Sequence, residues 1–312
     1  RARSRRFFQP GTLVPPRILA LHNVRFDDGE LRDYIAALDF GDLFNEPMLR
    51  LLRQFEEATT FGSLIQPCLN EQNITFARHA VETKDLGGQL FLRETHSKVL
   101  HVLEQAEMLC QRYHVVIANP PYMGSGQMNL LMKSFANDNF PDSKSDAFAM
   151  FIERGFHLTV QSGILAMLTM HSWMFLGSYE ELRRKILKSQ ICSCLHIGYN
   201  TFPELNSKIA QGAAIVLSNC EGTSRIGIFV GLNDAPQSAD KEAVFFEKKR
   251  IQSVHMLENA LSQSIPGNPI AYWLSSAARS AFSTMEKLGE FCRVGKGLDT
   301  GNNAQFLRLS HA

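Results

Sequence analysis

Four consecutive residues, Asn119, Pro120, Pro121 and Tyr122, place an amide, two proline rings and an aromatic ring side by side. The side-chain oxygen of Asn119 and the carbonyl oxygen of Pro120 are both hydrogen-bond acceptors, and Pro120 has no N–H to compete with them. Two converging acceptors can hold both hydrogens of a planar NH2 group. In adenine, this grip would localise the lone pair of the exocyclic nitrogen and stabilise the charge that develops as it attacks. Tyr122 can stack on the adenine ring. The four residues Asn119, Pro120, Pro121 and Tyr122 are therefore candidate catalytic residues.

The sequence before Asn119 predicts the element that positions it. Residues 115–118 are apolar and rich in β-branched side chains, a pattern typical of a strand buried on both faces of a parallel sheet. Pro120 and Pro121 end this strand, because each lacks an N–H and disfavours helical backbone in the residue before it. Asn119 is therefore expected at the carboxyl edge of a sheet, where open α/β sheets bind ligands. The alternative is a core strand that ends in prolines and a surface tyrosine.

Strands and helices alternate over much of the chain. Ser145 or Asp146 is predicted to cap a helix, and a further helix is expected up to Lys188. Short apolar runs predict strands at 17–23, 164–170, 191–197, 212–218 and 225–230. Since only a short turn joins the last two strands, we expect them to form a hairpin. The pattern predicts an α/β fold, with a mostly parallel sheet and an antiparallel edge hairpin.

Residues 24–112 have a helical rather than a strand pattern. Leu31, Ile35 and Leu38 recur at helical spacing, and similar groups follow later in this segment. No cluster of titratable residues flanked by glycines interrupts these helices. We therefore expect a helical insertion that packs on the sheet and is not an independent catalytic unit.

Composition limits the classes of function. The 312 residues are 45% hydrophobic and carry a net charge of +1, so any contact with DNA must come from local patches. No signal peptide or apolar run of about 18 residues is present, which predicts a cytoplasmic protein that does not enter a membrane. Of the six cysteines, only Cys192 and Cys194 lie close together. Without a second ligand pair nearby, they are expected to be buried thiols rather than metal ligands.

Asn119-Pro120-Pro121-Tyr122 after a strand resembles motif IV of the S-adenosylmethionine-dependent amino-methyltransferases, above all the adenine-N6 DNA methyltransferases. The resemblance implies a class I methyltransferase core with S-adenosyl-L-methionine as the cofactor. It also implies that the substrate is an adenine flipped out of double-stranded DNA. No metal is needed, because the sulfonium is already a strong methyl donor.

Two further segments resemble motifs of this family. The segment 146–153 resembles motif V, which implies that Phe151 packs against the adenine of the cofactor and that Asp146 lies beside it. Thr201-Phe202-Pro203, followed by Lys208, resembles motif VIII. This likeness implies that Phe202 and Lys208 bind the target base and that Phe202 stacks on it opposite Tyr122.

The amino-terminal segment matches the family less completely. The expected strand ending at His22 and Asn23 corresponds in position to motif III, so the resemblance assigns both residues to cofactor binding. The glycine-rich motif I and the acidic residue of motif II have no counterpart. The chain is therefore expected to be a middle segment of a longer enzyme, with the cofactor-binding motifs I and II outside it.

By overall pattern, the chain is most similar to the large adenine methyltransferases of the BREX phage-defence systems, known as PglX. The similar segments are residues 119–129, 146–153, 296–303 and 306–308. This likeness implies double-stranded DNA and possible contacts with other phage-defence proteins as partners. It also predicts four regions: the end of a cofactor-binding half (1–23), a helical insertion (24–112), the catalytic half (113–231) and a helical linker into a target-recognition region (232–312).

Two other functions fit the same motif. Asn-Pro-Pro-Tyr can serve any planar amine or amide, so a protein-glutamine or RNA methyltransferase is one alternative. The other is a catalytically inactive scaffold that binds DNA or partner proteins, which the missing motif I favours. The segment 201–203 and the long helical region favour the DNA methyltransferase over the first alternative.

Overall fold

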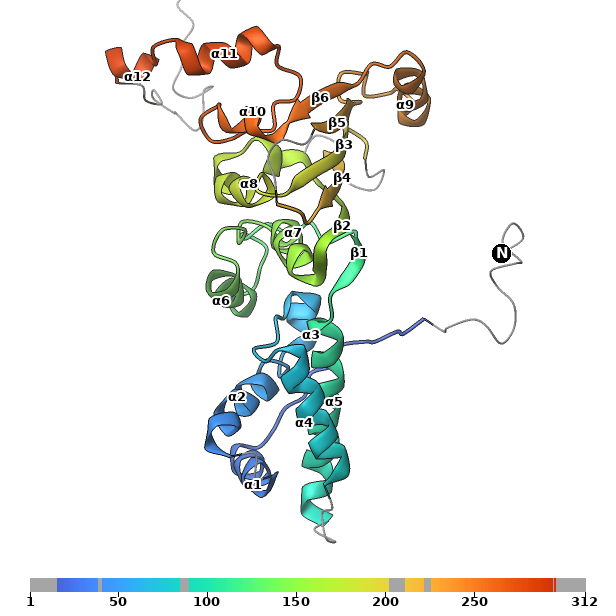
Figure 1. Cartoon of the computed structure of the whole chain (residues 1–312), viewed down its shortest axis with the longest axis vertical. Coiled ribbons are helices and arrows are strands. Elements are labelled where there is room, and N and C mark those ends of the chain that lie inside the picture. The colour runs from blue at the N-terminus through green and yellow to red at the C-terminus, as the bar shows by residue number, and fades with distance from the viewer. Residues whose placement is uncertain are drawn as a thin grey trace, which may run out of the picture.

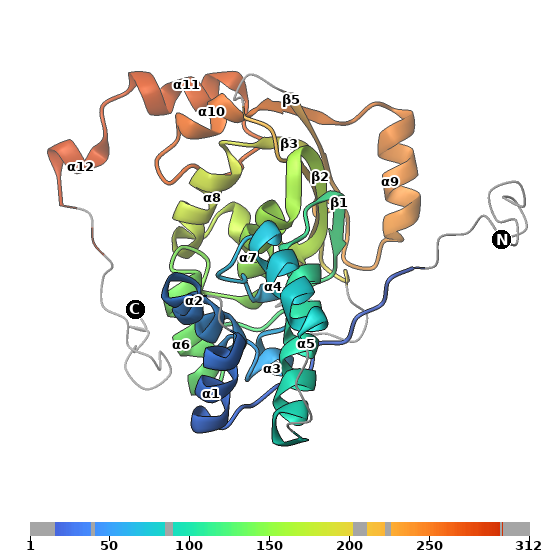
Figure 2. The ribbon, with the colours of Figure 1, turned by 60° about the horizontal axis from the view of Figure 1, so that its bottom comes forward.

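The computed structural model describes residues 16–38, 41–84, 90–201, 211–221, 226–293 and 295. Figure 1 shows a group of helices at one end of the molecule, a twisted sheet with helices beside it, and carboxyl-terminal helices beyond the sheet. Figure 2 shows that α9 lies on one side of the sheet region and that α11 and α12 lie on the other. No helix in the described ranges combines the length and the apolar character that crossing a membrane requires.

Five α-helices form the group before the sheet, and the expected helical character of residues 24–112 is confirmed. They are α1 (Asp28–Leu38), α2 (Asp42–Arg53), α3 (Ala58–Phe61), α4 (Glu71–Thr83) and α5 (Leu90–Cys110). The helical spacing explains their packing: Leu31, Ile35 and Leu38 share one face of α1 and are buried in a core with residues of the other four helices. Arg154, on the helix α7 (Ala147–Leu158), joins this group to the sheet region, because its guanidinium donates to the carbonyl oxygens of Ser63 and Leu109 at 2.9 and 2.7 Å.

Within the described residues, the sheet has six strands in the order β1-β2-β4-β3-β5-β6. Their bounds are β1 (Tyr113–Ala118), β2 (Thr159–Met170), β3 (Gln190–Gly198), β4 (Gly212–Ser218), β5 (Ile226–Gly231) and β6 (His255–Glu258). β1, β2, β3 and β5 run in one direction, whereas β4 and β6 run in the opposite direction. The expected α/β class with a mostly parallel sheet is confirmed.

The expected hairpin between β4 and β5 is wrong. β4 lies between β2 and β3 and is antiparallel to both, while β5 pairs with the far side of β3. The short connection between β4 and β5 suggested a hairpin, but β4 pairs with β2 along one edge and with β3 along the other. The antiparallel pair at the edge is β5 with β6, a strand that the sequence had placed within a helical linker.

β1 is an edge strand, and one of its faces is exposed. The expectation that it is buried on both faces is therefore wrong. Paired residues point to the same face of a sheet, and one such row runs across it: Ile117, Ala166, Val216, Ser193, Ile228 and Met256. Ile117 and Met256, at the two ends of this row, are 77% and 64% exposed. The opposite face packs on α7 and on α8 (Glu180–Ile186) in a second core.

The expected strand at 17–23 is also wrong. It pairs with no strand among the described residues, and Leu21 packs against the core of the helical group instead. The backbone N–H of His22 donates to Oε1 of Gln105 on α5 at 2.8 Å. Oδ1 of Asn23 accepts from the backbone N–H and the hydroxyl of Thr59 on α3, both at 2.8 Å. The polar end of this segment is therefore anchored on the helical group, whereas Ile18 is 88% exposed.

The other described helices are α6 (Leu130–Asn139), α9 (Lys241–Arg250), α10 (Asn259–Gln263), α11 (Ser276–Thr284) and α12 (Leu288–Phe291). Three 3-10 turns complete the elements: η1 (Gly62–Leu64), η2 (His171–Met174) and η3 (Gly177–Tyr179). η2 continues directly from the carboxyl end of β2, so it extends the chain beyond the same edge of the sheet that β1 reaches at Asn119.

Candidate active site

Asn119 follows the last residue of β1, as the sequence predicted, and lies at the carboxyl edge of the sheet. Asn119 is exposed, whereas the next residue, Pro120, is buried and anchors the turn. The hydroxyl of Tyr122 donates to Oδ1 of Asn119 at 2.8 Å and lies 3.2 Å from the carbonyl oxygen of Leu168 on β2. This contact brings together the amide oxygen and the aromatic ring of the motif.

The ring of Tyr122 is part of a row of aromatic side chains. Its centroid lies 6.4 Å from that of Phe148, which in turn lies 5.7 Å from that of Tyr179. Phe148 and Tyr179 are buried, so they fix the inner side of the Tyr122 ring. Burial raises the pKa of Tyr122 to about 12, so its hydroxyl is a neutral donor at physiological pH. This supporting role of Phe148 and Tyr179 was not predicted from the sequence.

Asp146 fixes the loop that follows the motif. It is the N-cap of α7, as predicted, and its Oδ1 accepts from the backbone N–H groups of Phe148 and Met123 at 3.2 and 3.1 Å. The backbone N–H of Ala147 donates to the carbonyl oxygen of Met123 at 3.0 Å. Burial raises the pKa of Asp146, while these backbone N–H groups oppose that rise. The carboxylate thus joins the start of α7 to the residue directly after Tyr122.

The other predicted site residues are not all gathered around Asn119. Phe151 lies on α7, half-buried where the core of the sheet meets a smaller core around α6. Phe202 and Lys208 lie outside the described residues. His22 and Asn23 contact α5 and α3 of the helical group. Their part in cofactor binding stays a prediction. The strand at 17–23 that suggested it is not formed.

A buried polar chain, which sequence reasoning missed, lies at the same edge of the sheet. Nδ1 of His171 lies 2.8 Å from Nε2 of His196, and Nδ1 of His196 lies 3.1 Å from the hydroxyl of Tyr272. Tyr272 also donates to Oδ1 of Asn233 at 3.4 Å. The sequence signal was the position of both histidines near the carboxyl ends of predicted strands, but their pairing depends on the position of β4 between β2 and β3. These polar contacts link β2, β3 and the segment after β5.

The histidine pair gives a prediction about stability and pH. Burial lowers the pKa of His196 from 6.5 to about 4, and that of His171 is also lowered by burial. The unfolded chain therefore takes up a proton near the ordinary histidine pKa, while folded His196 stays neutral down to about pH 4. We expect the free energy of unfolding to fall between pH 6.5 and 4, by up to about 1.4 kcal/mol per pH unit for this group.

Urea unfolding at a series of pH values measures this effect. His196→Gln, which cannot take up the proton, should flatten the dependence, whereas the same change at exposed His114 should leave it intact. An unchanged slope in His196→Gln would contradict the assignment.

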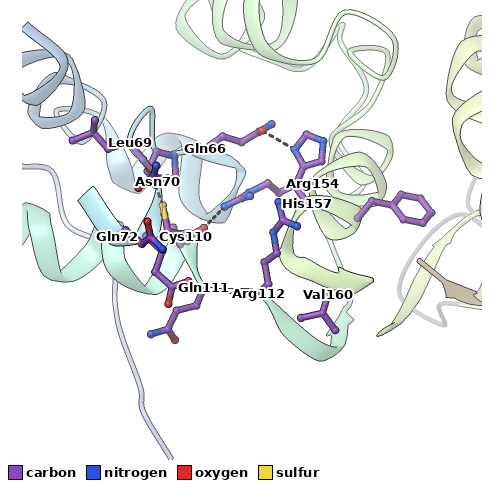
Figure 3. A pocket seen from close by; sticks show the side chains of 14 residues that line it. Gln66, Leu69, Asn70, Gln72, Cys110, Gln111, Arg112, Arg154, His157 and Val160 are labelled. Atoms are coloured by element: carbon purple, nitrogen blue, oxygen red, sulfur yellow. Dashed lines mark hydrogen bonds between the residues drawn. The ribbon is translucent and has the colours of Figure 1, made fainter. Parts of the chain in front are cut away.

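The largest cavity described lies elsewhere. Its volume is about 990 Å³, and it lies between the helical group and the amino ends of β1 and β2, opposite the edge that carries Asn119 (Figure 3). Arg154 reaches this cavity, but its donors are bonded to backbone carbonyls, and burial lowers its pKa to about 10. Size alone therefore does not mark the candidate active site.

Comparison with known proteins agrees with the motif. The family described as Eco57I restriction-modification methylase matches residues 53–202. The chain is 35% identical over 267 residues to the adenine-specific methyltransferase BrxX of Escherichia coli O9:H4 (strain HS), covering 84% of this chain and 22% of that protein. It is 30% identical over 292 residues to the adenine-specific methyltransferase PglX of Lacticaseibacillus casei (strain Zhang), covering 90% of this chain and 24% of that protein.

Among solved structures, the chain is similar to the methyltransferase subunit of a type I restriction-modification system from Streptococcus thermophilus. The TM-score is 0.34 at 13% identity, covering 54% of this chain and 43% of that chain. The chain spans less than a quarter of the length of the two curated relatives. By sequence, it is related over most of its length to part of the adenine-specific methyltransferases BrxX and PglX.

Proposed function

We propose that the protein transfers a methyl group from S-adenosylmethionine to the exocyclic N6 of an adenine in double-stranded DNA, in a phage-defence or restriction-modification role. The observation that carries the proposal is the position of Asn119 at the carboxyl edge of the sheet, with its Oδ1 2.8 Å from the Tyr122 hydroxyl and buried Pro120 next in the chain. The likeness to adenine-specific methyltransferases supports the choice of substrate. Such a protein would act in the cytoplasm, where the DNA lies.

In the proposed reaction, Oδ1 of Asn119 and the carbonyl oxygen of Pro120 accept the two hydrogens of the adenine amine. The lone pair of the nitrogen then forms the new N–C bond as the sulfur–methyl bond breaks, and the nitrogen afterwards loses one proton to solvent. S-adenosylmethionine supplies the methyl group as a sulfonium. The acceptors stabilise the positive charge on the nitrogen most strongly in the transition state, and this differential stabilisation accelerates the reaction.

The Tyr122 hydroxyl has one proton and two acceptors within reach, Oδ1 of Asn119 and the carbonyl oxygen of Leu168. While the proton points to Asn119, it orients the amide. When it points to Leu168, the amide oxygen can accept from the substrate. We propose that this exchange lets Asn119 bind the amine without leaving the Tyr122 hydroxyl unpaired.

Tyr122 variants test the two parts of this side chain. Tyr122→Phe removes the hydroxyl but keeps the stacking ring, so we expect a loss in kcat of less than about tenfold, in line with one neutral hydrogen bond. Tyr122→Ala removes the ring as well, and base stacking is worth about 1–3 kcal/mol, so a further loss of about five- to 150-fold in kcat/KM is expected. Steady-state methylation assays measure both, and equal losses in the two variants would contradict a stacking role for the ring.

Asp146 and Phe151 are the described residues that we propose to face the cofactor. Asp146 is the N-cap of α7 and Phe151 lies on that helix, where its ring is only half-buried, so part of it is available to pack against an adenine. Asp146 has one oxygen engaged by backbone N–H groups. Phe202 and Lys208 are proposed to hold the target base opposite Tyr122, from their likeness to motif VIII.

Two measurements test the proposal as a whole. Transfer of tritium from labelled S-adenosylmethionine to DNA, RNA or protein identifies the substrate, and digestion of the DNA identifies the methylated base. Equilibrium binding of the cofactor to the chain separates an enzyme segment from an inactive scaffold. Micromolar binding together with N6-methyladenine supports the proposal, whereas label in RNA or in glutamine would overturn it.

A further inference from the structure

Trp273 is a large apolar side chain that the fold leaves 46% exposed. It lies in a tight turn, in which the backbone N–H of Leu274 donates to the carbonyl oxygen of Ala271 at 3.1 Å. Its ring centroid lies 5.0 Å from that of Tyr272 and 5.3 Å from that of Phe175, both in edge contacts. The indole is thus held by two neighbouring rings, while nearly half of its surface faces solvent.

The turn is fixed to the same edge of the sheet as Asn119. Phe175 follows η2, the direct continuation of β2, and Tyr272 hydrogen-bonds to His196 near the carboxyl end of β3. β1, β2 and β3 are parallel, so their carboxyl ends lie along one edge. Trp273 is therefore attached above the ends of β2 and β3, on the same edge of the sheet as the end of β1 that carries Asn119.

Strand spacing gives the scale of the separation. Neighbouring strands lie about 4.8 Å apart, so the ends of β2 and β3 lie about 5–15 Å across the sheet from the end of β1. Successive bases along a DNA strand rise about 3.4 Å, so this distance corresponds to a few nucleotides. A DNA strand that delivers an adenine to Asn119 and runs along this edge would pass Trp273.

The chemistry of the surface fits a nucleobase. Every base has a flat π-face that stacks on aromatic rings, and an indole already held in place loses little conformational entropy on stacking. Nζ of Lys241 donates to the carbonyl oxygen of Leu232, directly after β5, at 2.8 Å. This places a positive charge at the same edge, where a phosphate backbone would gain from it.

We propose that Trp273 stacks on a base of the bound DNA a few nucleotides away from the extruded adenine. This inference rests on the proposed function, because it takes DNA to be the substrate. A protein surface is the other partner that an exposed indole fits, and it is treated as an outcome of the test.

The chain contains two tryptophans, and Trp173 is fully buried in the core. A change in tryptophan emission on adding a short duplex with one unpaired adenine therefore reports on Trp273. We expect quenching by this duplex, no quenching by heparin, a polyanion without bases, and loss of the signal in Trp273→Phe.

Fluorescence anisotropy of the labelled duplex measures the contribution to binding. Trp273→Ala should weaken binding about five- to 150-fold at fixed salt, while Trp273→Phe should retain most of the affinity. Phe282→Ala is the matched control, because Phe282 on α11 is also 46% exposed but has no place in the described ring cluster at this edge. Circular dichroism of each variant checks that the fold is kept.

Three outcomes would overturn the inference. The first is binding of the duplex with unchanged tryptophan emission, together with an affinity of Trp273→Ala equal to that of the unchanged protein. In that case, adenine methylation that still depends on Asn119 would show that the proposed function stands. The second is quenching by heparin as strong as by DNA, or no binding of the duplex to the chain. The third is emission that changes with protein concentration alone, which would assign Trp273 to a contact between copies.

Discussion

Asn119→Ala is expected to lower the rate of methyl transfer by at least about 10²–10³-fold, the usual loss when one charge-stabilising group is removed from an active site. The structure makes this residue the polar end of β1, and its Oδ1 is the acceptor that Tyr122 orients at 2.8 Å. Alanine retains the backbone turn set by Pro120 but removes the oxygen. The loss should appear in kcat rather than in the affinity for DNA, because the acceptor acts most strongly on the charged transition state.

Two matched changes make this test specific. Asn119→Asp keeps an acceptor at the same position and should retain more activity than alanine. Asn129→Ala removes another exposed asparagine from the same loop region, where it caps α6 by accepting from the backbone N–H of Met132 at 2.8 Å. This change should cost about 1 kcal/mol of stability with little effect on kcat. Undiminished methylation by Asn119→Ala would refute the proposed role of the motif.

The parts of this site that could be predicted from sequence are those that local chemistry determines. Two prolines end β1 whatever lies beside it, and Asp146 caps α7 through the backbone N–H of Phe148, two residues away. The helical spacing of residues 28–110 similarly produces a buried face within each helix. In each case, the signal and the structure that it predicts lie within a few residues of one another.

What sequence reasoning missed depends on long-range neighbours. Short apolar runs identify β4 and β5 as strands, but they do not reveal that β4 pairs with β2 and β3 instead of β5. The contact between His171 and His196 follows from that order of strands, and so does the attachment of Trp273 above them. Nothing in residues 17–23 indicates that His22 and Asn23 would contact α5 and α3 instead of ending a strand.

Arg183→Met is expected to lower the free energy of unfolding by about 3–5 kcal/mol. Arg183 lies on α8 and is 1% exposed, and burial lowers its pKa. Its guanidinium donates to the carbonyl oxygens of Trp173 and Leu176 at 2.8 and 2.6 Å, and twice to that of Gly267 at 3.0 and 2.6 Å. Methionine has a similar length but donates nothing, so three carbonyl oxygens lose a charged donor.

The neighbouring arginine provides the control that isolates this effect. Arg184 is exposed and pairs with Glu180 and Glu181 at 2.6 and 2.7 Å, so Arg184→Met should cost less than about 1 kcal/mol. Urea unfolding followed by circular dichroism measures both variants. Equal stability losses would contradict the role of Arg183. Because its bonds join the η2 turn to the segment that leads into Tyr272 and Trp273, the loss in Arg183→Met should also increase the mobility of Trp273. Tryptophan anisotropy in the folded variant should therefore fall, linking the stability of this buried cation to the surface that we propose to contact DNA.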